Sequence, residues 1–242
     1  MGSKEDRLFY TMQLLVTGIS TRVELAWKIC KEFGLVYPSG SVTRLIGEIK
    51  QMGLVETQHI RLFRSGSFEL IKLSQQGRQW CIDNSLGGVY GPKYSEWDYL
   101  REYHAGDSCP RHTAGLLMFA HQARKRRYYR VDLLPYVRTV LPYAYLPDWR
   151  PDAYIEGDGH GVYVEFETRA RLEKARAGKW EKAQRYANAN GGSLSIVAIY
   201  PYAREKLAEW APDALVTDLQ SLCRDQQRGL WYTGQDDQAS DT

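Results

Sequence analysis

The segment 41–52 constrains the fold of this chain more than any other stretch of its sequence. Its apolar residues recur at the spacing that places them on one face of a helix, and they are Val42, Leu45, Ile46, Ile49 and Met52. Gly53 follows as a stop signal. Because an amphipathic helix must bury its apolar face against other elements, the neighbouring segments are expected to pack on it.

Two further helices are predicted before this one. The first spans about 6–16, and the second begins after Thr21, whose side chain can cap it. Glu24, three residues on, would complete a capping box. Gly34 is expected to end the second helix, because glycine readily adopts the left-handed conformation found just past a helix C-terminus.

Two strand-like runs follow, at 54–63 and 68–73, and the turn-forming segment 64–67 joins them as a hairpin. Ser74 is then expected to cap a fourth helix that ends near Ile82. Helices followed by a β-hairpin in this order are typical of a winged helix-turn-helix, and we expect that fold at the N-terminus.

In a winged helix, the third helix enters the major groove of double-stranded DNA. Arg and Gln side chains read base edges, while Lys and Thr hold phosphates, so the outward face of 41–52 suits a groove. The DNA contacts expected are Thr43, Arg44, Lys50 and Gln51 from the helix, and Arg61 and Arg64 from the hairpin. The alternative is a winged helix used for protein contacts, and Glu48 on the flank of the helix favours it mildly.

A set of three carboxylates forms the second candidate site. Asp152 starts a strand predicted at 151–156. Glu165 and Glu167 share one face of a strand predicted at 161–168, because alternate residues of a strand face the same way. Mg²⁺ prefers hard oxygen ligands and can activate a water beside a phosphodiester. We predict catalytic roles for all three, with Asp152 and Glu165 as magnesium ligands and mutual repulsion when the metal is absent.

A lysine completes this candidate catalytic set. A helix is predicted at 171–189, and Lys179 falls in the middle of its buried face, where a lysine is costly without an anionic partner. Glu165 or Glu167 is the expected partner, and Lys179 would orient water or stabilise the transition state. The alternative is a buried ion pair in a nuclease-like scaffold that does not cut.

Breaks in composition divide the chain into four parts. Turn-forming residues near 84–94 end the winged-helix domain, 1–85, and a helical connector is predicted over 86–130. Strands alternate with helices over 131–230, which indicates an α/β sheet domain in a chain of the α+β class. The further elements predicted there are strands at 194–200 and 214–217 and helices at 202–210 and 218–228. The polar tail, 231–242, is expected to be disordered.

The carboxylate segments resemble the PD-(D/E)XK nuclease superfamily. Pro151-Asp152 matches the PD element, and Glu165-Phe166-Glu167 occupies the (D/E)XK element. Glu167 stands where that superfamily usually has lysine, although a minority of restriction enzymes also carry E-x-E and others take the lysine from the next helix, as Lys179 would provide it. The resemblance implies a restriction-endonuclease-like fold for the α/β domain.

More specifically, the chain resembles the replication-relaxation family of plasmid and mobile-element proteins over about 10–200. The matching pieces are Pro151-Asp152-Ala153, Glu165 through Arg169, and Lys182 through Tyr186. This resemblance implies DNA binding linked to plasmid replication or DNA relaxation. Two hypotheses therefore stay open: a Mg²⁺-dependent DNA endonuclease or nickase, and a DNA-binding regulator or replication accessory protein with a non-catalytic scaffold.

Charge adds one more candidate DNA contact. The net charge is only +3, but a dense basic cluster at the end of the connector suits phosphate contact, and it comprises Arg124, Lys125, Arg126, Arg127 and Arg130. A solvated helix end explains the same cluster equally well. His112, in the segment before this cluster, is expected to have only a packing or surface role.

The remaining features concern partners and compartment. No apolar run is long enough to span a membrane, and the N-terminus has no apolar signal core. The four cysteines show no CxxC spacing, which favours reduced thiols over a structural zinc. We expect a cytoplasmic protein without an organic cofactor. Its expected partners are double-stranded DNA and either a second copy of the chain or another protein of the mobile element.

Overall fold

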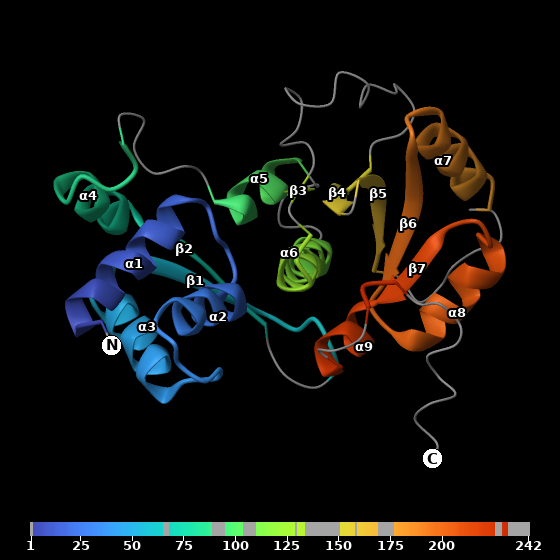
Figure 1. The fold of residues 1–242 in the computed structure, drawn as a ribbon. Helices are drawn as coiled ribbons and strands as arrows, with labels where there is room; N and C mark the ends of the chain where they lie inside the picture. The colour runs from blue at the N-terminus through green and yellow to red at the C-terminus, as the bar shows by residue number, and fades with distance from the viewer. Residues whose placement is uncertain are drawn as a thin grey trace, which may run out of the picture. The chain divides into compact units, whose positions relative to one another are not determined.

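The structure, a computed structural model, describes residues 2–64, 68–88, 95–103, 110–128, 130–133, 151–157, 159–168, 177–225 and 229–231. The chain forms two compact units, Met1–Pro110 and Arg111–Thr242 (Figure 1). Within the described ranges, no helix combines the length and the apolarity that a membrane crossing requires.

The first unit is built from helices and a β-hairpin, as the sequence predicts. Its elements are α1 (Lys4–Val16), α2 (Arg22–Glu32), α3 (Gly40–Gln51), β1 (Val55–Ile60), β2 (Phe68–Leu73), α4 (Gln75–Asp83) and α5 (Glu96–Tyr103). Strands β1 and β2 pair antiparallel, with Val55 opposite Leu73 and Ile60 opposite Phe68. An isolated antiparallel bridge between Thr21 and Leu70 ties the start of α2 to the hairpin.

Local signals in the sequence set the helix ends. Thr21 accepts a hydrogen bond from the N–H of Glu24 at 3.2 Å, and Ser74 accepts one from the N–H of Gly77 at 2.9 Å. Gly34 and Gly53 follow α2 and α3 with φ of +63° and +71°, in the left-handed region that favours glycine. These caps are the ones that the sequence predicts.

The apolar face of α3 is buried in the core of the first unit. Val42, Ile46 and Ile49 pack with residues of α1, α2, α4 and the hairpin, and Leu45 is buried as well. Met52 was predicted on the same face, and that prediction is wrong: α3 ends at Gln51, and Met52 is its C-cap with 48% of its surface exposed. The last turn of the predicted helix therefore does not extend the buried face.

Helix α5 belongs to the first unit. The N–H of Glu96 donates to the carbonyl of Gly18 at 2.9 Å, and the N–H of Trp97 donates to the Ser20 hydroxyl at 2.9 Å. Helix α6 (Pro110–Lys125) begins at the last residue of the first unit and lies in the second. The middle of the chain is mainly helical, as the sequence predicts.

The second unit is built on a mixed five-stranded sheet in the order β3-β4-β5-β6-β7. Its further elements are β3 (Arg130–Leu133), β4 (Ala153–Gly157), β5 (His160–Glu167), α7 (Ala177–Ala189), β6 (Gly192–Ala198), α8 (Pro201–Trp210), β7 (Leu215–Asp218) and α9 (Leu219–Arg224). Strands β3, β4 and β5 pair antiparallel, and β5, β6 and β7 pair parallel. The sequence predicts each of these strands except β3.

Helices α6 and α7 cover opposite faces of β5 (Figure 1). A Cβ on Gly115 of α6 would lie 2.2 Å from Cζ of Phe166, so only glycine allows this close approach. On the other face, Trp180 and Ala183 of α7 pack with Tyr163. Because strand residues alternate between faces, Glu165 and Glu167 lie on the α7 side, as the sequence predicts.

Candidate functional site

Asp152 is fixed beside β5 by two hydrogen bonds. Its N–H donates to the carbonyl of Val164 at 2.8 Å, and its Oδ2 accepts from the N–H of Phe166 at 2.7 Å. The residue is only 8% exposed. The start of β4 therefore holds this carboxylate against the strand that carries Glu165 and Glu167.

Lys179 joins the two glutamates. Its Nζ lies 2.6 Å from Oε2 of Glu165 and 3.7 Å from Oε1 of Glu167. Both glutamates are buried, whereas the lysine side chain is 40% exposed. The predicted pairing is thus present in the structure, and it lies at the edge of the site that is open to water.

The predicted burial of Lys179 is wrong. Trp180, the next residue of α7, is 1% exposed and occupies the centre of the buried face together with Ala183. The Nζ of Lys179 lies 4.5 Å from the centroid of the Trp180 ring, which adds a cation–π contact. The buried residues of α7 are Trp180, Ala183, Tyr186 and Ala187, and Lys179 lies outside this face.

His112 of α6 belongs to the same cluster, although the sequence gives it only a packing or surface role. Its Nε2 lies 3.2 Å from Oδ2 of Asp152, and its ring packs edge-on against Phe166 at 5.6 Å between centroids. Burial lowers the pKa of His112, but the hydrogen bond to Asp152 and the charges of Asp152, Glu165 and Glu167 outweigh it and raise the pKa above its ordinary value.

The candidate site therefore combines three carboxylates with a lysine and a histidine partner. The sequence predicts that the carboxylates repel one another without a metal; in the structure Lys179 pairs with Glu165 and Glu167, and His112 lies against Asp152. Asp152 and Glu165 are hard oxygen donors of the kind that Mg²⁺ prefers. No cluster of three or more His, Cys, Asp or Glu in the described residues is arranged to hold a metal.

The raised pKa of His112 predicts a pH-dependent stability. Protonated His112 stabilises the folded state, so its contribution is fully present below pH 6.5, its ordinary pKa, and is lost as pH rises through the higher folded-state pKa. In metal-free buffer, the difference in melting temperature between the wild type and His112→Gln should shrink as pH rises through that window. His160→Gln, which changes an exposed histidine of the same unit, should show a smaller pH trend. A difference that stays constant with pH would contradict the charge interaction.

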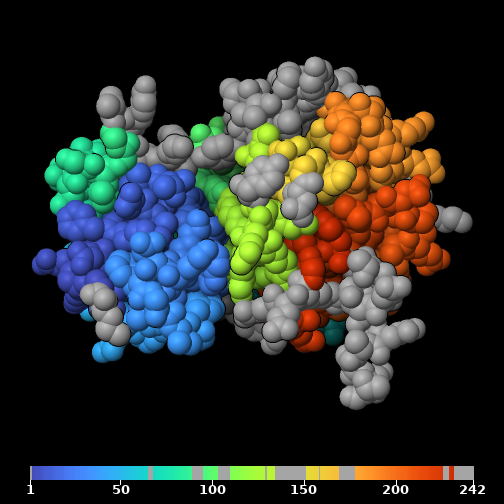
Figure 2. Space-filling model, in the orientation of Figure 1, coloured from blue at the N-terminus to red at the C-terminus, as the bar shows by residue number. Residues whose placement is uncertain are grey.

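The predicted DNA-reading residues of α3 are exposed. The side chains of Thr43, Arg44 and Gln51 have no hydrogen-bond or ion-pair partner within the described part of the chain. Lys50 differs, because its Nζ lies 3.2 Å from Oε1 of the buried Glu69, to which Arg22 also bonds at 2.7 Å. In the space-filling view, the lighter blue residues of α2 and α3 form part of the exposed surface of the first unit (Figure 2).

Some of the arginines predicted to contact DNA, in the hairpin and in the basic cluster, form hydrogen bonds within the chain. Arg61 donates to the carbonyl of Arg64 at 2.7 Å, beside the segment 65–67 that lies outside the described residues. Arg126 donates to the carbonyls of Leu222 at 3.1 Å and Asp225 at 2.9 Å, so it anchors the end of α6 to α9.

The other residues of the basic cluster divide by exposure. Arg130 pairs with Asp132 and Glu156, which compensates its charge. Arg124 and Lys125 are half-buried, and Arg127 is the exposed member of the cluster. Residues 169–176 and 232–242, on which parts of the family resemblance and the predicted tail fall, lie outside the described residues.

A search of protein families, curated proteins and solved structures found no match to this chain.

Proposed function

We propose that this chain binds double-stranded DNA through its first unit and cleaves or nicks it with Mg²⁺ at the carboxylate cluster of its second. The observation that carries the proposal is that Lys179 of α7 pairs with both Glu165 and Glu167 of β5, while Asp152, just before β4, is bonded to the same strand at Phe166. Convergent carboxylates and a cation are what hydrolysis of a phosphodiester requires.

The element order of the first unit supports a winged helix. Three helices precede an antiparallel hairpin. The isolated bridge between Thr21 and Leu70 adds a third, very short strand pairing to this hairpin. The outward side of α3 carries polar side chains without partners in the described part of the chain. In this proposal Arg44 and Gln51 read base edges, and Thr43 contacts the phosphate backbone of the DNA. Lys50 would exchange its contact with Glu69 for a phosphate.

The second unit is proposed to be restriction-endonuclease-like. Its mixed sheet places Asp152 at the start of one strand and Glu165 and Glu167 at the end of its antiparallel neighbour. Asp152 and Glu165 would hold Mg²⁺, which supplies Lewis acidity and an activated water. Lys179, at the solvent edge of the cluster, would stabilise negative charge on the phosphate. From the motif resemblance to replication-relaxation proteins, the proposal extends to a host process on a plasmid or mobile element.

One observation favours a second candidate function. Asp152, Glu165 and Glu167 are each less than a tenth exposed and are bonded to His112 or Lys179, as in a closed structural ion-pair network. In that case the chain is a DNA-binding regulator or replication accessory protein whose second unit is a scaffold. Incubation of supercoiled plasmid with Mg²⁺ or Mn²⁺ separates the two candidates, because only the first converts it to nicked or linear DNA.

The α3 assignment predicts separable effects on DNA binding. Arg44→Ala and Gln51→Ala should each weaken binding to the preferred sequence by about 1–3 kcal/mol and relax its specificity, because a base-reading side chain is lost. Fluorescence anisotropy with a selected duplex and a scrambled one measures both effects. Gln13→Ala, at an exposed position on α1, is the control. If affinity and specificity are unchanged in both α3 variants, this helix does not recognise bases.

A further inference from the structure

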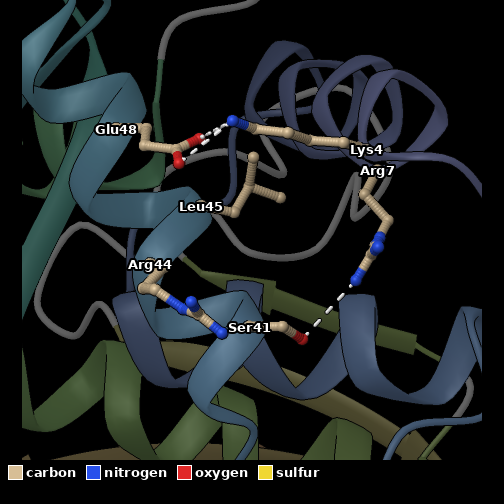
Figure 3. Close-up of a pocket in the computed structure, with 6 residues that line it drawn as sticks. All are labelled: Lys4, Arg7, Ser41, Arg44, Leu45 and Glu48. Atoms are coloured by element: carbon tan, nitrogen blue, oxygen red, sulfur yellow. Dashed lines mark hydrogen bonds and ion pairs between the residues drawn. The ribbon is translucent and has the colours of Figure 1, made fainter.

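A hollow lies between the start of α1 and the first half of α3 in the first unit. It has a volume of about 240 Å³ and is lined by Lys4, Arg7, Ser41, Arg44, Leu45 and Glu48 (Figure 3). Of these residues, only Arg44 enters the DNA-binding surface predicted from the sequence. The other polar residues have no role in the proposed function.

The charges of this hollow are only partly compensated. The Nζ of Lys4 lies 3.0 Å from Oε2 of Glu48, which satisfies the single carboxylate among the lining residues. Asp6, on the same turn of α1, accepts from the N–H of Ser3 at 2.7 Å as part of a capping box. Arg7 and Arg44 thus keep their positive charges without a carboxylate partner within the described part of the chain.

Arg7 and Arg44 line the same hollow from two different helices. Arg7 lies 3.5 Å from the Ser41 hydroxyl, and Figure 3 shows Arg44 among the residues that line the hollow, from α3. The Ser39 hydroxyl pairs with that of Ser41 at 2.9 Å and makes no cap bond to the first turn of α3. Two like charges that line one hollow favour an anion between them.

We infer that this hollow binds a phosphate group, with Arg7 and Ser41 as its donors and with Arg44, the proposed base-reading residue, adding positive charge to its lining. Guanidinium forks match the oxygens of a phosphate with paired, charge-assisted hydrogen bonds, and a hydroxyl supplies a further donor. The phosphate belongs either to the DNA backbone or to a small phosphate ester. The first source rests on the proposed function and would extend the α3 contact surface to α1, whereas the second source is independent of it.

One experiment without DNA tests the hollow itself. Melting curves are recorded in inorganic phosphate and in chloride at equal ionic strength and pH, because a ligand that binds only the folded state raises its stability. Arg7→Gln removes a lining charge outside the proposed base-reading set. Lys31→Gln removes one charge from an exposed position on α2 and is the matched control. We expect Arg7→Gln to weaken phosphate binding by about tenfold and the control to leave it unchanged.

A second arm identifies the source of the phosphate. If the DNA backbone fills the hollow, Arg7→Gln should weaken binding to all duplexes alike by about tenfold and lower the slope of log affinity against log salt by about one. If a small ester is the ligand, phosphate stabilisation is lost while DNA affinity stays unchanged. If the wild type binds no DNA, the proposed function fails, and the melting curves in phosphate alone then test whether the hollow binds a phosphate group.

The inference is overturned if Arg7→Gln matches Lys31→Gln in both arms. Circular dichroism checks that the variant is folded, because Arg7 also donates to the carbonyl of Ser3 at 3.3 Å. If Arg7→Gln fails this check, Ser41→Ala removes the donor hydroxyl without changing charge and replaces it in both arms. Phosphate and DNA binding equal to wild type in that variant would likewise overturn the inference.

Discussion

Replacing Asp152 with Asn is expected to lower the rate of Mg²⁺-dependent plasmid cleavage by about a thousandfold or more. A catalytic metal contributes several kcal/mol of transition-state stabilisation, and this change removes one of its two charged ligands. DNA affinity should stay within about twofold of wild type, because the substitution lies in the second unit and the proposed base contacts lie in the first. Gel analysis of supercoiled plasmid over time measures the cleavage rate.

Asp213→Asn is the matched control, since it neutralises an exposed carboxylate of the same unit. It should cleave at the wild-type rate.

In metal-free buffer, Asp152→Asn should cost about 1 kcal/mol of stability, because Asn loses the carboxylate contact with His112 but can still accept from the N–H of Phe166. If Asp152→Asn cleaves at the wild-type rate, Asp152 has no role in the reaction.

Lys179→Met is expected to have the second largest effect. It leaves Glu165 and Glu167 buried without the cation that joins them and should destabilise the fold by about 1–3 kcal/mol. The cost stays below that of a fully buried pair because the lysine side chain is 40% exposed, so water replaces part of the lost interaction. Cleavage should stop as well, because charge on the transferred phosphate loses its stabilising cation.

Urea unfolding measures the stability of this variant, and Lys206→Met, at an exposed position on α8, is its control. Lys179→Arg should recover most of the stability, because a guanidinium can pair with both glutamates. A variant Lys179→Met as stable as its control would show that the ion pairs contribute nothing to the fold.

The first unit could be predicted closely from the sequence because its signals are local. Thr21, Ser74, Gly34 and Gly53 act within a few residues of the helix ends that they define, and apolar spacing identifies the buried face of α3. Strand β3 was missed because only one of its residues, Leu133, is buried, and the strand adjoins a basic cluster that reads as a helix end.

The site was predictable where strand alternation or a neighbouring helix carries the information. Glu165 and Glu167 follow from alternation, and Lys179 follows from its spacing on the next helix, although its exposure does not. His112 could not be found in this way, because its contact with Asp152 joins residues 40 positions apart on a helix and a strand end. Such a contact depends on how α6 packs against β5, which Gly115 and Phe166 decide.

Melting curves of the wild type and Asp152→Asn across a Mg²⁺ titration test most directly whether the carboxylate cluster is a metal site. A ligand that binds only the folded state stabilises it by about 2.7 kcal/mol at a hundred times its Kd. We predict that Mg²⁺ raises the melting temperature of the wild type and of the Asp213→Asn control, and that Asp152→Asn loses this response. A wild type whose melting temperature is unchanged by Mg²⁺ and whose plasmid substrate stays intact would contradict the account, and would leave the second unit as a scaffold held by Lys179 and His112.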